Sequence, residues 1–369
     1  MKVPLSKPCI NDEMINEVVK ALKNEKLVGG ESVESFETQF SDYIGTQHAV
    51  AVNSGTSAIF LILKAMGIKQ GDYVIVPSAT FIATVNSVFN CGALPLFADI
   101  EGDSNNISPN KIVEFFEIYG KKIKAIMPVH LYGRPANMKE ILEIGNKYNV
   151  PVIEDACQAH GAKYKGEKTG SIGYAAAFSF YSSKNMTVGG DGGMVTTNDK
   201  DLADKIKQLR NQGSSMTNRY LHEIVGYNFR LNSINAAIGK VQLKYIDIWN
   251  NNRNKIAKFY YNELKNISTI KLPNEESGME SSWHLFVIRT HGRDKLSAFL
   301  KQNGIETGVH YPIPIHLQPA YKFLNKGNYE LFETEKWSKE VLSLPIFNEM
   351  TIEEAKFVSD FIKEYYGGN

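Results

Sequence analysis

Between residues 48 and 155 the sequence alternates short apolar runs with segments that have helical character. The apolar runs are "HAVAVN" (48–53), "YVIVP" (73–77), "LPLFADI" (94–100), "IKAIMPV" (123–129) and "VPVIED" (150–155). The helical segments between them are residues 56–67, 82–92, 108–118 and 137–148. Continuous apolar strands separated by helices predict a mostly parallel sheet that is covered on both faces.

The flanking segments predict further elements. Helices 13–24 and 31–44 precede the alternation, and "AFSFYSSKNMTVGGDGGMV" (177–195) adds two apolar runs. Helices dominate residues 200–265, and a strand (284–289) precedes helices near 293–303, 332–341 and 351–365. We therefore expect a large α/β domain, residues 1–245, and a smaller C-terminal α+β domain, residues 246–369.

The bulk properties argue against several functional classes. The net charge of +1 gives no global field that would attract nucleic acid or an acidic membrane surface. No apolar run approaches the roughly 18 residues of a membrane span, and the N-terminus lacks a signal-peptide core. The three cysteines (Cys9, Cys91 and Cys157) have no metal-ligand spacing, which predicts no metal site and a reducing, cytoplasmic location.

One lysine, Lys184, lies between the two apolar runs of the 177–195 stretch. Loop lysines are usually solvated, so a functional role for this one requires partners elsewhere in the chain. Ligands of open parallel sheets bind beyond the carboxyl ends of the strands. The segments just past those ends are "NSGTS" (53–57), "PSATF" (77–81), "VHLYG" (129–133), "EDACQ" (154–158) and "YSSK" (181–184).

Two of these segments offer an anion site and a carboxylate. Gly55 and Thr56 begin a helix whose free amides and hydroxyls could hold a phosphate, although simple N-capping would also explain them. Ser179 adds a hydroxyl. Strand alternation points Glu154 and Asp155 to opposite sides, so one could cap the next segment and the other could hold a protonated ring nitrogen.

Two further side chains suit a flat aromatic ligand. Gln158 could bond a ring hydroxyl, and Phe81 either packs in the core or stacks on the ring. A lysine amine, a carboxylate, a phosphate cradle and an aromatic ring are together the set that pyridoxal 5′-phosphate (PLP) requires. The lysine forms a Schiff base with the aldehyde, and the carboxylate keeps the pyridine nitrogen protonated so that the ring accepts electrons.

With these residues in place, the sequence resembles the DegT-type (DegT/DnrJ/StrS) PLP-dependent nucleotide-sugar aminotransferases. The resemblance covers nearly the whole chain, and its motifs include "GGESVESFETQFSDYIG" (29–45), "VHLYGRPANM" (129–138), "VIEDACQAHGAKYKG" (152–166), "GYNFRLNSINAAIGKVQL" (226–243) and "HYPIPIHLQPAY" (310–321). It implies fold type I of the aspartate aminotransferase superfamily and a homodimer with shared active sites.

The resemblance also implies a role for each matching residue. Catalytic roles fall to Lys184, as the Schiff-base lysine and proton carrier, and to Asp155, at the pyridine nitrogen. Further cofactor contacts are implied for Gly55, Thr56, Phe81, Gln158, Ser179 and, from the neighbouring subunit, Asn228. Substrate contacts are implied for Tyr181, Arg230, His310 and Tyr311.

The implied reaction moves an amino group from L-glutamate to a keto group of a nucleotide-linked deoxysugar. Lysine at position 184 argues for transamination, because dehydratase relatives have histidine there. Tyr181 stands where many relatives have histidine, which concerns the subgroup and not the chemistry. Asp191 in "GGDGG" favours a 3-keto over a 4-keto sugar. Two alternatives stay open: an enzyme of the same fold acting on a cyclitol ketone, and a regulatory protein that has kept the fold.

Overall fold

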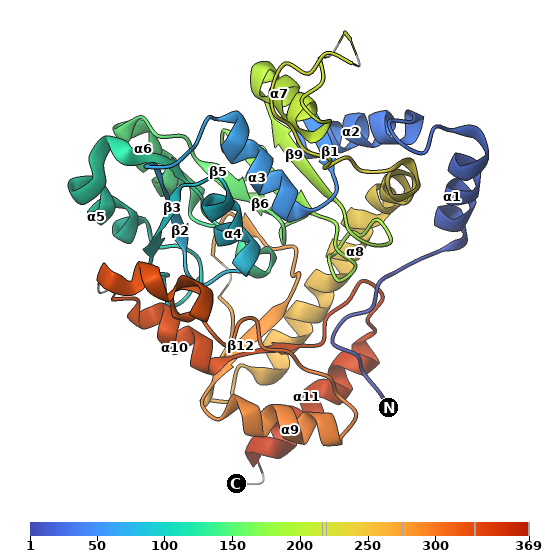
Figure 1. The fold of residues 1–369 in the computed structure, drawn as a ribbon. Helices are drawn as coiled ribbons and strands as arrows, with labels where there is room; N and C mark the ends of the chain where they lie inside the picture. The colour runs from blue at the N-terminus through green and yellow to red at the C-terminus, as the bar shows by residue number, and fades with distance from the viewer. Residues whose placement is uncertain (216, 219, 275, 328–329, 368–369) are drawn as a thin grey trace.

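The computed structural model describes residues 1–215, 217–218, 220–274, 276–327 and 330–367. Its central element is a sheet made of two parts (Figure 1). One part has the order β1 (His48–Val52), β9 (Gly193–Thr197), β8 (Ala175–Ser179) and β5 (Ile153–Asp155). The other has the order β3 (Leu94–Ala98), β2 (Tyr73–Pro77) and β4 (Ile123–Ile126).

Parallel bridges from Ile126 to Val152 and from Val129 to Asp155 join the two parts. Strand β9 is antiparallel to both of its neighbours, whereas β5 and β8 are parallel to each other and β2 is parallel to β3 and β4. The mostly parallel mixed sheet that the sequence predicts is therefore confirmed. Because parallel strands end at the same edge, the loops after β2 and β5 reach one side of the sheet.

Helices cover both faces, as the continuous apolar strands require. On β1, Val50 and Val52 pack with the face covered by α3 (Gly55–Ala65), α4 (Ile82–Asn90) and α7 (Lys200–Arg210). Ala49 and Ala51 pack with the opposite face, which is covered over this part of the sheet by α2 (Glu31–Ile44) and α8 (Ser233–Leu264). Helices α5 (Pro109–Tyr119) and α6 (Met138–Tyr148) pack over the β3–β2–β4 part.

The C-terminal part has its own core around an antiparallel sheet of the order β10 (Ile270–Lys271), β12 (Phe286–Thr290) and β13 (Val341–Leu344). Its helices are α9 (Arg293–Gln302), α10 (Phe332–Glu340) and α11 (Ile352–Gly367). Val3 belongs to the same core and pairs with Ile305, so the first residues pack on this part. The division at residues 245 and 246 falls inside α8 and stays a prediction.

The remaining elements are short. Helix α1 (Asp12–Asn24) packs against α8, and a small sheet joins β6 (Lys163–Tyr164), β7 (Glu167–Lys168) and β11 (Met279–Glu280). The described residues form four 3₁₀ helices: η1 (Gly120–Lys122), η2 (Leu131–Gly133), η3 (Ile315–Leu317) and η4 (Pro319–Gly327). In the described part of the chain, no helix combines the length and the apolar character needed to cross a membrane.

Two expectations differ from the structure in detail. The expected helical region 200–265 is interrupted, because most of the described residues between 211 and 232 are irregular. Asn232 caps α8 by accepting a hydrogen bond from the amide of Asn235 (2.8 Å). The helix expected at 332–341 ends at Glu340, and the next four residues form β13. All four residues of β13 are buried, but Ser343 interrupts this short apolar run and no loop separates it from α10, so the sequence gives no sign of a separate strand.

Candidate active site

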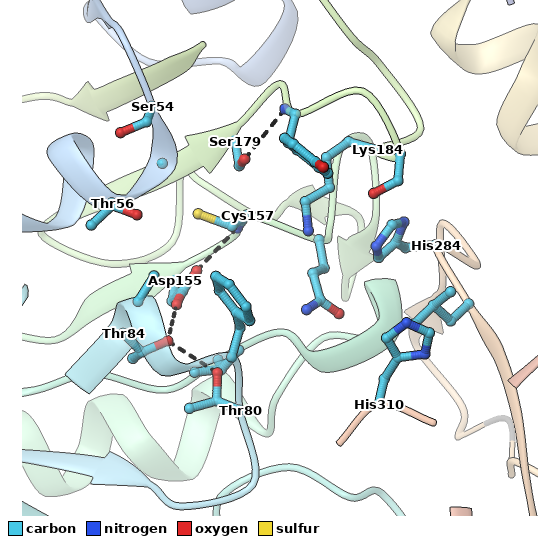
Figure 2. Close-up of a pocket in the computed structure, with 18 of the residues that line it drawn as sticks. Ser54, Thr56, Thr80, Thr84, Asp155, Cys157, Ser179, Lys184, His284 and His310 are labelled. Atoms are coloured by element: carbon cyan, nitrogen blue, oxygen red, sulfur yellow. Dashed lines mark hydrogen bonds between the residues drawn. The ribbon is translucent and has the colours of Figure 1, made fainter. Parts of the chain in front are cut away.

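A cavity of about 530 Å³ opens at the sheet edge beyond the carboxyl ends of the strands. Ten of the twelve predicted site residues line it: Gly55, Thr56, Phe81, Asp155, Gln158, Ser179, Tyr181, Lys184, His310 and Tyr311. In Figure 2 the labelled hydroxyl residues Ser54, Thr56 and Ser179 lie on one side of Lys184, and two histidines lie on the other. The cavity therefore has a hydroxyl-rich end and a histidine end.

The hydroxyl-rich end is the N-terminus of α3. Ser54 caps the helix, because its Oγ accepts a hydrogen bond from the amide of Ser57 (3.1 Å). The amides of Gly55 and Thr56 donate to no group among the described residues, so they are available to an anion. A Cβ at Gly55 would lie 2.7 Å from the Cβ of Ser179, so the helix meets strand β8 this closely only with glycine.

The two adjacent acids of β5 have different partners. The Asp155 carboxylate is 4% exposed and accepts hydrogen bonds from the Thr84 hydroxyl (2.7 Å) and from the Cys157 amide (3.2 Å). Glu154 is fully buried on the other side, where it bonds His130 and the amides of residues 170, 172 and 173. Asp155 is thus the acid that reaches the cavity, and it also caps the segment that follows it.

Lys184 enters the cavity from the turn after β8, where its amide donates to the carbonyl of Tyr181 (2.8 Å). Burial lowers the pKa of its ammonium group below 10.5, and the neighbouring Cys157 and Asp155 partly oppose that shift. A lysine whose pKa is lowered by burial is a better nucleophile and base at neutral pH than a solvated one.

The middle of the cavity is lined by Gln158 and two aromatic rings. Gln158 accepts a hydrogen bond from the amide of Tyr132 (2.8 Å) and donates one to the hydroxyl of Tyr311 (3.3 Å). Burial raises the pKa of Tyr311, so its hydroxyl stays protonated. Phe81 is 51% exposed at the start of α4 and lies 5.8 Å from the Tyr311 ring, measured between ring centroids. A half-exposed ring at the cavity favours stacking over core packing for Phe81.

The histidine end contains His310, which was predicted, and His284, which was not. A hydrogen bond of 2.8 Å joins His310 Nδ1 to the Ser343 hydroxyl, and burial together with the charge of Lys184 lowers the pKa of His310 to about 4. His310 is therefore neutral at pH 7.

Asn228 and Arg230, the other two predicted site residues, do not reach this cavity. Asn228 is exposed and pairs through its backbone with Asn211. Arg230 donates a hydrogen bond to Asn211 Oδ1 (2.6 Å) and lines a separate surface pocket that also contains Lys26, Lys207 and Arg210.

Sequence reasoning missed several residues that shape the cavity. Thr84 holds Asp155 from the first turn of α4, and only its polar character in an apolar helix could have suggested it. Ser54 was detectable as the N-cap before Gly55. Leu5 and His284 come from distant parts of the chain and carry no local signal.

Similar proteins point to one chemistry. Residues 8–363 match the model of the DegT/DnrJ/EryC1/StrS aminotransferase family. A dTDP-3-amino-3,4,6-trideoxy-α-D-glucose transaminase of Streptomyces venezuelae is 39% identical over 94% of this chain and 90% of its own length. A dTDP-3-amino-3,6-dideoxy-α-D-galactopyranose transaminase of Aneurinibacillus thermoaerophilus is 41% identical over 92% of this chain and 91% of its own.

A solved structure agrees with these relatives. The crystal structure of S. venezuelae DesV superposes with a TM-score of 0.95 at 37% identity and covers 99% of this chain and 98% of that one. The relatives include a "pleiotropic regulatory protein" of Geobacillus stearothermophilus, 38% identical over 97% of this chain and 95% of its own, but the family is one of enzymes. The chain therefore belongs to the DegT/DnrJ/EryC1/StrS aminotransferase family and is a sugar aminotransferase with the fold of PLP-dependent enzymes.

Proposed function

We propose that this enzyme transfers the amino group of L-glutamate to the keto group of a nucleotide-linked deoxysugar, with PLP bound in the cavity. One observation carries the proposal: the Lys184 amine, the Asp155 carboxylate and the free amides of the α3 N-terminus line a single cavity. Relatives named as transaminases of amino sugars support the substrate class.

The residues present fit the cofactor. The amides of Gly55 and Thr56 with the Ser179 hydroxyl would hold its phosphate, which carries about −1.5 to −2 charges at pH 7. Asp155, an acceptor held by two donors, would face the ring nitrogen. A structural relative, NtdA of Bacillus subtilis, was solved with bound pyridoxamine phosphate (PMP) and superposes with a TM-score of 0.88 at 32% identity.

When bound, PLP supplies an electron sink for the carbon that carries the amine. The chain supplies the rest. Lys184, with its lowered pKa, takes a proton at Nζ and returns it. Asp155 would stabilise positive charge at the ring nitrogen, and the Thr84 hydroxyl fixes the direction in which that carboxylate points. The same residues serve both half-reactions, which predicts ping-pong kinetics.

The acceptor is proposed to be a 3-keto sugar. Asp191 lines the same cavity, and a carboxylate there can accept hydrogen bonds from sugar hydroxyls. Two relatives are named for 3-amino sugars, and a third, from Acidithiobacillus ferrooxidans, is named a UDP-N-acetyl-3-dehydro-α-D-glucosamine 3-aminotransferase. A GDP-perosamine synthase of Caulobacter vibrioides is also related, at 41% identity over 82% of this chain.

We also propose a homodimer in which Asn228 and Arg230 complete the partner's cavity. Both lie outside their own chain's cavity, in a segment that exposes large apolar side chains. Val225 is 87% exposed, and α1 presents Ile15, Val19 and Leu22 to the surface. Exposed apolar groups of this number indicate a protein interface. A cytoplasmic location stays part of the proposal.

The function is tested by loading the purified protein with PLP and offering it L-glutamate with nucleotide-linked 3-keto and 4-keto deoxysugars and with a cyclitol ketone. We expect an aminated 3-keto sugar and 2-oxoglutarate in equal amounts by mass spectrometry, and no product from protein stripped of cofactor. Product from the cyclitol ketone alone would show that the acceptor is a cyclitol ketone and not a nucleotide-linked sugar. No product from any ketone would contradict it.

A further inference from the structure

His284 rests on a chain of buried amides that lies beneath the cavity. Its Nδ1 is 3.3 Å from Asn185 Oδ1, and both side chains are buried. The Asn185 side-chain amide donates to Asn250 Oδ1 (3.0 Å) and to the carbonyl of Ser282 (2.7 Å). Asn250 in turn donates to the carbonyl of His160 (2.8 Å).

These hydrogen bonds determine which way each side-chain amide points. Asn250 must turn its NH₂ group toward the His160 carbonyl, because a carbonyl oxygen only accepts hydrogen bonds. Its oxygen then faces Asn185, which also faces the Ser282 carbonyl, so Asn185 must present NH₂ to both. The Asn185 oxygen is therefore the atom directed at His284.

The direction of Asn185 determines the tautomer of His284. An amide oxygen cannot donate, so the proton must sit on Nδ1 of His284. The other ring nitrogen, Nε2, then carries a lone pair and no proton. Burial and the nearby positive charge of Lys184 hold the pKa of His284 well below its usual value, so the ring does not gain a second proton at pH 7.

The ring of His284 lines the cavity beside Lys184 (Figure 2), and among the described residues no group forms a hydrogen bond with Nε2. The backbone is held as firmly as the ring, since the buried guanidinium of Arg253 donates to the carbonyls of Trp283 (2.9 Å) and His284 (3.3 Å). Nε2 is thus a fixed acceptor with a free lone pair at the reacting end of the cavity.

Because Nε2 has no proton, it cannot donate a hydrogen bond to a ketone oxygen, but it can accept a hydrogen bond from a hydroxyl group. A side chain beside Lys184 lies close to the substrate atoms around the carbon at which Lys184 would add or remove a proton. We propose that His284 is a specificity-determining residue whose Nε2 accepts a hydrogen bond from a sugar hydroxyl on a carbon adjacent to the aminated one. This inference rests on the proposed function, since it requires a sugar substrate.

The tautomer is tested without turnover by neutron diffraction from deuterium-exchanged crystals of the PLP-loaded enzyme. We expect deuterium on Nδ1 of His284 and none on Nε2. Deuterium on Nε2 would overturn the proposal, because that nitrogen would then be a donor. This measurement does not depend on which sugar the enzyme uses.

The role is tested with His284→Asn, whose side-chain NH₂ can replace Nδ1 toward Asn185 while the cavity acceptor is lost. The probes are glutamate, dTDP-3-amino-3,6-dideoxy-α-D-galactose and its 4-deoxy counterpart dTDP-3-amino-3,4,6-trideoxy-α-D-glucose, each reacted with the PLP form in a single half-reaction followed by cofactor absorbance. The matched control is His291→Asn, the same change at a side chain that is 92% exposed.

For His284→Asn we expect a loss of about 10- to 100-fold in kcat/KM with an amino sugar and a change within about twofold with glutamate. A loss confined to the first sugar identifies the 4-hydroxyl as the partner of Nε2, and an equal loss with both sugars identifies the 2-hydroxyl. No loss with either sugar, or an equal loss with glutamate, would overturn the proposal. A wild-type enzyme that reacts with glutamate but with neither sugar contradicts the 3-amino substrate instead, and the neutron map then decides whether Nε2 is an acceptor.

Discussion

The cavity at the sheet edge and the 211–232 segment differ in how far one chain completes them. Around the cavity, strands β2, β5 and β8 end together, and ten predicted residues meet without help from another molecule. In the 211–232 segment, Asn228 is exposed and Arg230 faces a surface pocket. The comparison teaches that a parallel sheet brings ligand groups together by its own geometry, whereas an irregular surface segment has no such common edge. For that reason the role of Asn228 and Arg230 in a site rests on the proposed homodimer.

The largest effect should come from Lys184→Ala, which removes the reactive amine from the cavity. We expect transamination to fall by at least about 10⁴-fold, because both the nucleophile and the proton carrier are lost. The exposed Lys121→Ala is the matched control and should keep full activity. Turnover is measured by 2-oxoglutarate release. Normal turnover in Lys184→Ala would show that this cavity does not carry out the reaction.

Gly55→Ala should weaken cofactor binding by about 100-fold. Its new Cβ would lie 2.7 Å from the Cβ of Ser179 and 2.8 Å from the sulfur of Cys157, so the α3 N-terminus must move away from β8. Equilibrium dialysis against PLP gives the dissociation constant. Gly367→Ala is the control, because a Cβ there would meet no atom of the described residues within 4 Å. Unchanged affinity in Gly55→Ala would mean that the phosphate is held elsewhere.

Asn228→Ala should weaken PLP retention by about tenfold, which corresponds to one lost hydrogen bond to a charged group. If the residue acts across subunits, mixing this variant with Lys184→Ala should restore activity at limiting PLP, because each mixed dimer then contains one intact site. Subunit exchange followed by the transamination assay measures the recovery. Mixed dimers without recovered activity would show that the 211–232 segment serves its own chain or no site.

The smallest effect should come from Thr84→Val, which removes the hydroxyl donor to Asp155 but keeps the shape of the side chain. We expect kcat to fall about fivefold, because the carboxylate retains its bond from the Cys157 amide. Thr84→Ser keeps the hydroxyl and should recover most of the rate. If valine and serine variants behave alike, the bond between Thr84 and Asp155 has no part in the reaction.

The sequence predicts the sheet and its ligand edge because short, continuous apolar runs locate buried strands and polar residues follow where the strands end. Gly55, Asp155 and Lys184 all lie within a few residues of such an end. β13 is missed because it follows Glu340 of α10 without a loop and because Ser343 interrupts an apolar run of only four residues. His284 is missed because the hydrogen bonds that orient its ring run through Asn185 and Asn250, which are distant in sequence. No local pattern encodes a contact of that kind.

Helix α8 runs unbroken for 32 residues, a length of about 48 Å, from the central sheet into the C-terminal core. Asn250 and Arg253, which support the floor beneath His284, both lie on its middle turns. The first half of α8 packs in the core beneath the central sheet, and its last turns pack in the C-terminal core. Asn250, just past the midpoint of the helix, therefore ties the orientation of the imidazole to both cores.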